Sequence, residues 1–264
     1  MRRDAKYYDM HGEMDRSFLH PGGREATEKL LSLLPSLGED STIVEIGCGV
    51  GATARLIMER FRCSYIGIDS SSRMLDRARE RLGEHNSRVT LIECDVQIDR
   101  LPLAAESVSA VIAESVFAIL EPRKIFGECY NVLKNEGIVV WNDRIWGESV
   151  SLENRLKVND VSKKLFGFHA APEDLPTAED WKKFVESKSF RMISCEQLSR
   201  NDNSVSISNT KLFTERVMVL RLLAQRKFLR FRYYDYAMKK KFGKLWTKME
   251  NWIFMAQKEL IHLN

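Results

Sequence analysis

A long apolar segment is missing from this sequence, and its absence limits where the chain can reside. Of 264 residues 44% are hydrophobic and 30% are charged, and no stretch approaches the roughly 18 consecutive apolar residues of a membrane-spanning helix. Residues 1–10 are polar and of mixed charge, without the apolar core of a secretory signal. We therefore expect a cytoplasmic protein that does not cross a membrane.

Closely spaced cysteines are also missing. The five cysteines are odd in number and far apart, with no Cys-x-x-Cys pair and no Cys/His spacing that would build a zinc site. They are Cys48, Cys63, Cys94, Cys129 and Cys195. The sequence thus argues against a disulfide framework and a structural metal, and it predicts free, buried thiols.

Internal repeats and low-complexity tracts are absent, and what is present is an alternation of short apolar runs with helical patterns. Such alternation favours an α/β fold with a doubly wound, mostly parallel sheet and right-handed crossovers. The first five predicted strands are residues 42–46, 65–69, 90–94, 110–113 and 138–141. The length suits one core with an elaboration rather than two full domains.

Four regions follow from this pattern. We expect a helical lead-in over residues 1–40, a core over 41–200, a basic helical insertion over 201–250, and a last strand with a tail over 251–264. Within the core, residues 147–176 read as a loop or short helices over the rim of the site. A helix over 177–188 and a strand over 191–196 follow, with capping-box residues at the start of that helix.

The most informative segment is an apolar strand that runs into a turn with three glycines, Gly47, Gly49 and Gly51, and then into a helix near Ala52. Glycines let the backbone turn tightly and let a ligand approach closely, while the helix N-terminus offers free N–H groups. A ligand is therefore expected at this turn. The glycines alone do not identify it, because Gly47-x-Gly49-x-x-Ala52 also fits the loose pattern of dinucleotide-binding proteins.

Acidic residues near the ends of three successive strands narrow the choice of ligand. Asp69 ends the second strand, where a carboxylate can accept hydrogen bonds from ribose hydroxyls, and Asp95 follows the third, where it can accept from an adenine amine. Glu45 lies inside the first strand beside the turn and can face a cationic amino group. Three acids at one edge of the sheet suit a positively charged ligand without phosphates.

The ordered combination of residues 44–51, Ile68-Asp69, Glu93-Cys94-Asp95 and the turn after Ala113 resembles the successive motifs of the class I S-adenosylmethionine-dependent methyltransferases, with a domain of methyltransferase type 11. The resemblance covers about residues 40–143. It implies a seven-stranded sheet, S-adenosylmethionine as the methyl donor and S-adenosylhomocysteine as the product.

The resemblance also assigns the donor site. Asp69 would bind the ribose, Asp95 and Val96 would flank the adenine, and Met74 would cover it. The full set expected to bind the donor is Tyr8, Glu45, Gly47, Cys48, Gly49, Gly51, Asp69, Ser70, Met74, Asp95, Val96 and Glu114. Tyr8 and His20 belong to the lead-in, which resembles segments that fold over the donor in some small-molecule members of the family.

Methyl transfer from a sulfonium is an in-line displacement, so most of the catalysis can come from proximity and orientation. A base helps only if the acceptor is a hydroxyl or an acid. Our candidates are Glu114 after the fourth strand, Asp143 after the fifth, and His20, with His169 on the rim as a further histidine.

The sequence leaves three hypotheses open for the function: methylation of a small molecule or peptide, methylation of RNA or protein, and donor binding without catalysis. The Asn-Pro-Pro-Tyr motif that often marks amino-nitrogen methylation of nucleic acid or protein is absent, which favours a small-molecule or peptide-sized acceptor. Residues 211–258, however, carry 13 Lys and Arg against three acids, interleaved with aromatics. Such a segment can contact RNA, an acidic protein or a membrane surface, or it can be an amphipathic lid whose lysines stay in water. A non-catalytic donor-binding module is the third hypothesis.

Charge is distributed unevenly along the chain, which agrees with two kinds of partner. Residues 1–150 carry 19 Lys and Arg against 24 Asp and Glu, a net charge of −5, while residues 151–264 carry 22 against 13, a net charge of +9. The two halves are therefore expected to face different partners.

Overall fold

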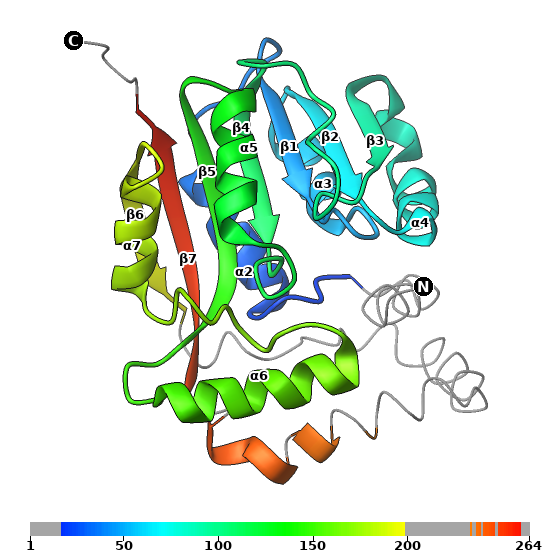
Figure 1. The fold of residues 1–264 in the computed structure, drawn as a ribbon. Coiled ribbons are helices and arrows are strands. Elements are labelled where there is room, and N and C mark those ends of the chain that lie inside the picture. Colours follow the sequence, from blue (N-terminus) through cyan, green and yellow to red (C-terminus); the bar gives the residue numbers. More distant parts are fainter. Residues whose placement is uncertain (1–16, 199–232, 234–235, 239, 246–247, 260–264) are drawn as a thin grey trace.

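The computed structural model describes residues 17–198, 233, 236–238, 240–245 and 248–259. A seven-stranded sheet organises them, in the order β3-β2-β1-β4-β5-β7-β6 (Figure 1). The strands are β1 (Thr42–Ile46), β2 (Ser64–Asp69), β3 (Val89–Glu93), β4 (Val108–Glu114), β5 (Leu133–Trp146), β6 (Phe190–Gln197) and β7 (Met249–Lys258). The first five are parallel, and β7 runs antiparallel to both β5 and β6. The predicted doubly wound, mostly parallel seven-stranded sheet is confirmed.

Helices cover both faces of this sheet because the central strands are apolar on both sides. They are α2 (Gly23–Leu33), α3 (Ala52–Arg60), α4 (Ser72–Leu82), the 3₁₀ helix η1 (Gly83–Arg88), α5 (Pro122–Val132), α6 (Leu152–Phe166) and α7 (Ala178–Glu186). On β1, Ile43 packs with α2, α3 and α4, whereas Val44 and Ile46 face α5 and α7. Successive side chains of a strand point to opposite faces, so one short strand serves two cores.

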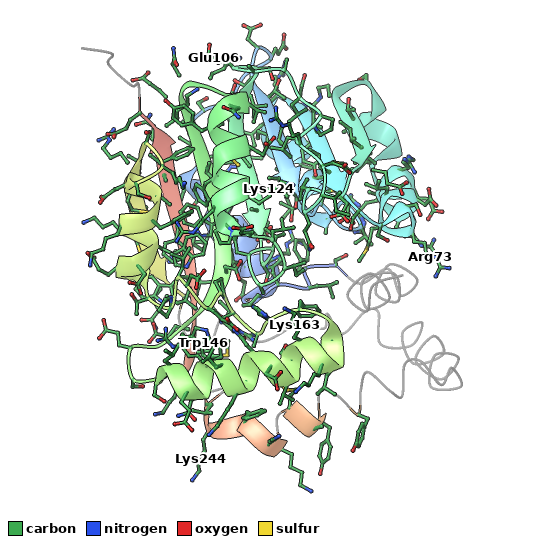
Figure 2. All side chains as sticks on the ribbon, viewed as in Figure 1. Arg73, Glu106, Lys124, Trp146, Lys163 and Lys244 are labelled. Atoms are coloured by element: carbon green, nitrogen blue, oxygen red, sulfur yellow. The ribbon has the colours of Figure 1, made fainter. Side chains whose placement is uncertain are left out.

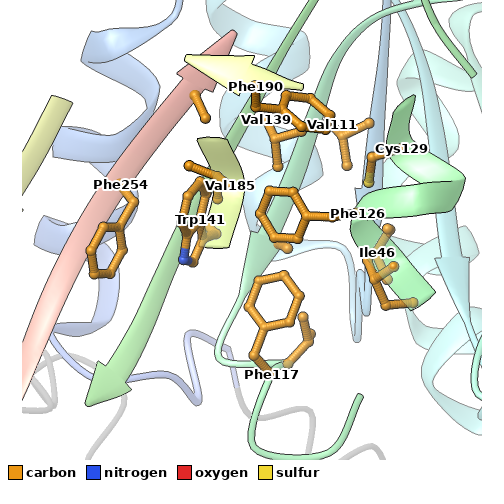
Figure 3. Packing of buried hydrophobic residues seen from close by; sticks show 14 of the residues in the cluster. Ile46, Val111, Phe117, Phe126, Cys129, Val139, Trp141, Val185, Phe190 and Phe254 are labelled. Carbon is orange, nitrogen blue, oxygen red and sulfur yellow. The ribbon is translucent and has the colours of Figure 1, made fainter. Parts of the chain in front are cut away.

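An aromatic cluster fixes the antiparallel edge of the sheet to the parallel part (Figure 3). Trp141 of β5 stacks on Phe254 of β7 with ring centroids 4.9 Å apart, and Phe126 of α5 meets Trp141 edge-on at 5.2 Å. Trp181 of α7 closes the cluster at 5.3 Å from Trp141. Aromatic pairs of this kind add about 0.5–1.5 kcal/mol each beyond the burial of their area. The last strand is thereby held against the sheet.

The expectation of a loop or short helices over residues 147–176 is wrong for part of that segment, because α6 is a regular helix of 15 residues. Its ends have ordinary signals: Ser151 caps the first turn by accepting from the Asn154 N–H, and Gly167 ends the helix with a φ of 97°. Its apolar pattern is faint because it covers only a small third core with Trp146, Val150, Met238 and others.

The position of α6 matters for the site, since it lies beyond the carboxyl ends of the parallel strands (Figure 1). Asn159 of α6 is fully buried and fixes the following loop: its amide donates to the Ala171 carbonyl at 2.9 Å and its oxygen accepts from the Ala170 N–H at 2.8 Å. Trp146, labelled near α6 in Figure 2, donates its indole N–H to the Pro172 carbonyl at 3.1 Å. The loop after α6 therefore runs along the carboxyl edge in a defined path.

Two boundaries differ from expectation at the middle of the chain. Strand β5 begins at Leu133, five residues before its predicted start, and extends to Trp146, five residues past its predicted end. The extension past residue 141 pairs with β7 from Asn142↔Ile253 to Trp146↔Met249. The boundaries proposed for the lead-in, core, insertion and tail stay predictions, and most of residues 201–250 lies outside the described residues.

Candidate functional site

The glycine turn joins β1 to α3 and uses its three glycines for different reasons. All three adopt left-handed conformations, with φ of 76° at Gly47, 53° at Gly49 and 73° at Gly51. A Cβ on Gly47 would lie 2.7 Å from Cγ1 of Val116, and one on Gly51 would lie 3.1 Å from the Cβ of Ala78. Around Gly49, apart from its two chain neighbours, no heavy atom of the described residues comes within 4 Å of that position. The turn is thus packed at both ends and open at its centre.

Asp69 ties this open turn to the end of β2. Its Oδ2 accepts from the Gly49 N–H at 2.9 Å, and its Oδ1 accepts from the Ser71 N–H at the start of α4, also at 2.9 Å. The carboxylate is half-buried, and each of its oxygens can accept more than one hydrogen bond. One side chain therefore holds the turn and the N-terminus of α4 at the same edge of the sheet.

The remaining residues expected around the adenine lie at the ends of β2 and β3. Met74 is buried in the first turn of α4, and its N–H donates to Ser71, while Ser70 is exposed. Asp95 is half-buried and accepts from the Gln97 N–H at 3.1 Å, and Val96 beside it is buried. These positions share the carboxyl edge with the glycine turn, since β2 and β3 run parallel to β1.

Two buried glutamates lie behind the turn. Glu45 on β1 accepts a hydrogen bond of 2.5 Å from the hydroxyl of Tyr65 on β2. Burial raises the pKa of Glu45 well above its usual value, and the negative charge of Glu114 adds to this, whereas hydrogen bonds from Tyr65 and Thr53 lower it. Glu114 at the end of β4 accepts from Thr53 of α3 at 2.9 Å and from Thr27 of α2 at 3.0 Å. The acids are linked through Thr53.

His20 of the lead-in joins this network from the other side. Its Nε2 lies 3.2 Å from Oε2 of Glu114, and its Nδ1 lies 3.1 Å from the amide nitrogen of Asn142. That amide nitrogen also donates to the Pro21 carbonyl at 3.1 Å, which lies 3.2 Å from Nδ1 of His20 as well, and Nε2 of His20 lies 3.0 Å from the hydroxyl of Thr27. The lead-in is thereby bonded to the ends of β4 and β5.

Asp143 has a supporting position. It is fully buried on β5, with Oδ2 accepting from the Phe117 N–H at 2.9 Å and Oδ1 from the Arg144 N–H at 2.8 Å. Burial raises its pKa to about 7, and the two N–H donors and the charge of Arg144 lower it only partly. Nearby, the His169 N–H donates to the Ala118 carbonyl at 3.1 Å, which places the loop after α6 beside the turn that follows β4.

The structure therefore brings together most of the residues expected from the sequence. Cys48 is buried in the turn, where burial raises the pKa of its thiol. Tyr8 and most of residues 211–258 lie outside the described residues. Of the described part of that segment, Phe242 packs into the third core, and Lys258 is buried and donates to the Leu133 carbonyl at 2.8 Å.

Sequence reasoning missed Thr27, Thr53 and Tyr65, which are polar partners of the two glutamates, and Asn142, whose amide contacts His20 and Pro21. Each is buried. A weak signal existed for Asn142, a polar residue inside an apolar strand, and for Thr53 in the first turn after the glycines. Nothing local marks Thr27, because its partner Glu114 is 87 residues away in the chain.

Two further observations concern metal-binding clusters and membrane-spanning helices. Among the described residues, no three His, Cys, Asp or Glu side chains cluster as they would around a metal ion. No helix in the described part of the chain is long and apolar enough to cross a membrane.

Comparison with known proteins points to one family. Residues 44–141 match the family model of a methyltransferase domain. Over 240 residues the chain is 23% identical to a phosphoethanolamine N-methyltransferase of Plasmodium falciparum, with 89% of this chain and 85% of that protein covered.

Solved structures share the fold. A phosphoethanolamine N-methyltransferase 2 from Haemonchus contortus, in complex with phosphomonomethylethanolamine and S-adenosylhomocysteine, superposes on 92% of this chain with a TM-score of 0.66 and 21% identity. The chain spans 54% of the length of that protein. The [4+2]-cyclase SpnF superposes on 97% of this chain, and on 96% of its own, with a TM-score of 0.73 and 17% identity.

Proposed function

The chain belongs to the class I S-adenosylmethionine-dependent methyltransferases, and from this premise we propose that it methylates a small molecule that carries an anionic group. The observation that carries the proposal is the open position over Gly49, beside Asp69 and in front of the buried acids. A cradle that a Cβ would fill, edged by carboxylates, suits a cationic donor without phosphates.

We propose the following roles for the side chains of the site. Asp69 would bind the ribose hydroxyls, and Met74, Asp95 and Val96 would surround the adenine. The remaining donor contacts would come from Tyr8, Glu45, Gly47, Cys48, Gly49, Gly51, Ser70 and Glu114. When bound, S-adenosylmethionine supplies an electrophilic methyl group on a sulfonium.

Catalysis would come mainly from holding the acceptor in line with that methyl group, because the candidate bases are engaged inside the protein. His20 and Glu114 bond each other, and both oxygens of Asp143 accept from backbone N–H groups. These three stay our candidates for taking a proton from a hydroxyl or acid acceptor. An amine acceptor with a free lone pair needs less help.

An anionic group on the acceptor is supported by Arg155 of α6. It lies on the same helix face as the buried Val158, Asn159 and Ser162, three to seven residues further on, and α6 covers the carboxyl edge (Figure 1). Its Nε is buried, and within the described residues it has no hydrogen-bond partner. A buried donor without a partner costs stability, and a phosphate or carboxylate would satisfy it. The likeness to phosphoethanolamine methyltransferases agrees with such an acceptor.

The alternative acceptors and the location of the protein stay proposals of lower rank. Contact with RNA or an acidic protein would use residues 211–258, which lie mostly outside the described part. We also propose a cytoplasmic location, because the five cysteines are free thiols, as is usual in a reducing compartment.

The test is formation of S-adenosylhomocysteine from S-adenosylmethionine with a panel of acceptors. The panel pairs anionic compounds with neutral analogues, such as phosphoethanolamine with ethanolamine, and includes total RNA. We expect turnover with at least one anionic small molecule and much less with its neutral partner. Turnover only with neutral compounds or only with RNA would contradict the proposal.

A further inference from the structure

The two buried glutamates behind the glycine turn share one threonine, and the protons available to them can be counted. Glu114 accepts from two hydroxyls, those of Thr27 and Thr53, and Nε2 of His20 lies 3.2 Å from its Oε2. A carboxylate with this many polar partners is well stabilised as an ionised group. Glu114 therefore fits its site as an anion.

Glu45 has fewer hydrogen-bond donors than Glu114. Its one strong donor is the hydroxyl of Tyr65, at 2.5 Å. The hydroxyl of Thr53 also lies within reach of Glu45, but its single proton points to Glu114 at 2.9 Å. Thr53 can then only accept from Glu45, which requires a proton on Glu45. The side chain is 3% exposed, so water cannot supply the missing donor easily.

The charges around Glu45 favour the same state. The titratable groups that face it are Tyr65 and Asp69 from β2, Cys48 from the glycine turn and Glu114 from β4. All of these are neutral or negative, no cation is among the described groups that shift the pKa of Glu45, and the imidazole of His20 contacts Glu114 instead. Two carboxylates that share a site without a cation cannot both ionise readily, and burial raises the pKa of Glu45 accordingly.

We propose that Glu45 holds a proton in the donor-free protein and releases it to solvent when the positively charged amino group of the donor enters the site. Donor binding is then coupled to the loss of one proton, and the carboxylate that forms balances the incoming ammonium. The inference rests on the proposed function, because it takes this edge of the sheet as the donor site. It makes the affinity for the donor depend on pH through a residue that contacts no acceptor.

The experiment is calorimetric titration of the full chain with S-adenosylhomocysteine at pH 6, in two buffers whose ionisation enthalpies differ widely. The difference between the two apparent binding enthalpies gives the number of protons released. We expect about one proton per ligand. 5′-Methylthioadenosine, which has the adenosine and the sulfur but no amino-acid part, should bind without releasing a proton.

Two variants localise the proton. Glu45→Gln keeps an oxygen for the Tyr65 hydroxyl but cannot ionise, so it should bind S-adenosylhomocysteine more weakly than the wild type and release no proton. Glu59→Gln changes an exposed acid of α3 that pairs with Arg55 and should behave like the wild type. Equal proton release from wild type and Glu45→Gln would overturn the inference.

The wild type alone gives a second test, which does not depend on the folding of any variant. As long as Glu45 is protonated, the affinity for S-adenosylhomocysteine should rise up to about tenfold per pH unit, while that for 5′-methylthioadenosine stays flat. Binding of S-adenosylhomocysteine without proton release or pH dependence would overturn this inference and leave the proposed function intact. A complete lack of binding would overturn both.

Discussion

Gly47 and Gly49 stand two residues apart in the same turn, and adding one methyl group to each should have different consequences. In Gly47→Ala the new Cβ would lie 2.7 Å from Cγ1 of Val116, on a backbone with φ of 76°. The left-handed conformation costs about 1–2 kcal/mol and the overpacking about 1–3 kcal/mol. We expect a loss of about 2–5 kcal/mol in the free energy of unfolding.

In Gly49→Ala the methyl group meets no atom of the described residues within 4 Å apart from its chain neighbours, so the fold is destabilised only by the backbone strain, about 1–2 kcal/mol. The same methyl group would occupy the space proposed for the donor. A contact overpacked by about 1–3 kcal/mol weakens the binding of S-adenosylhomocysteine roughly 5- to 150-fold.

Urea unfolding and calorimetric titration of both variants measure the two effects separately. Val116→Ala is the matched second change: it removes the atom that clashes in Gly47→Ala, so the double variant should be more stable than the sum of the two single effects. It should not restore donor binding to Gly49→Ala. The reasoning is refuted if Gly49→Ala binds like the wild type, or if Gly47→Ala is as stable as Gly49→Ala.

Three further changes test other parts of the account. Burial raises the pKa of Asp143 to about 7 in the folded state. Between about pH 4 and 7 the folded protein therefore binds a proton at this residue that the unfolded chain does not bind. As pH rises through that window, Asp143 should lower the free energy of unfolding by up to about 4 kcal/mol. In urea titrations at pH 5 and 8, Asp143→Asn should lose this part of the slope, and an unchanged slope would be evidence against the burial argument. Asn159→Leu should lower the free energy of unfolding by about 2–3 kcal/mol and make residues 167–173 more sensitive to proteolysis, because buried backbone groups lose their hydrogen-bond partners. Unaltered proteolysis would mean that Asn159 does not hold the loop. Arg155→Met should raise KM for an anionic acceptor about tenfold or more with little change in donor affinity, whereas the exposed Lys157→Met should not; equal effects of the two would remove the case for Arg155.

The sheet was readable from the sequence because its strands are short apolar runs bounded by turn residues. Strand β1 begins and ends where it was predicted, at Thr42 and Ile46. The end of β5 was not readable, since Asn142, Asp143 and Arg144 look like the start of a loop. They stay in the strand because β7, more than 100 residues later, pairs with them. The local sequence around residue 142 does not indicate a pairing partner that lies so far along the chain.

The candidate site also has a part that was predicted from the sequence and a part that was not. The glycines and the acids at the strand ends were predicted because the turn geometry and the ligand chemistry demand those residue types at those places. The hydroxyl groups that serve the acids were not predicted, because threonine is common and the bonds from Thr27 and Thr53 to Glu114 span distant parts of the chain. Helix α6 was missed because its inner face covers a small separate core and so lacks a clear apolar period.

The most direct test of the donor site is calorimetric titration with S-adenosylmethionine, S-adenosylhomocysteine and NAD, on the wild type and on Asp69→Ala. Asp76→Ala, which removes an exposed acid of α4 that pairs with Arg79, is the control. We predict that the first two ligands bind, that NAD does not, and that Asp69→Ala weakens binding about 10- to 100-fold through the loss of about 1.5–3 kcal/mol of hydrogen bonding. Binding of NAD alone, or equal affinity in Asp69→Ala and Asp76→Ala, would contradict the account.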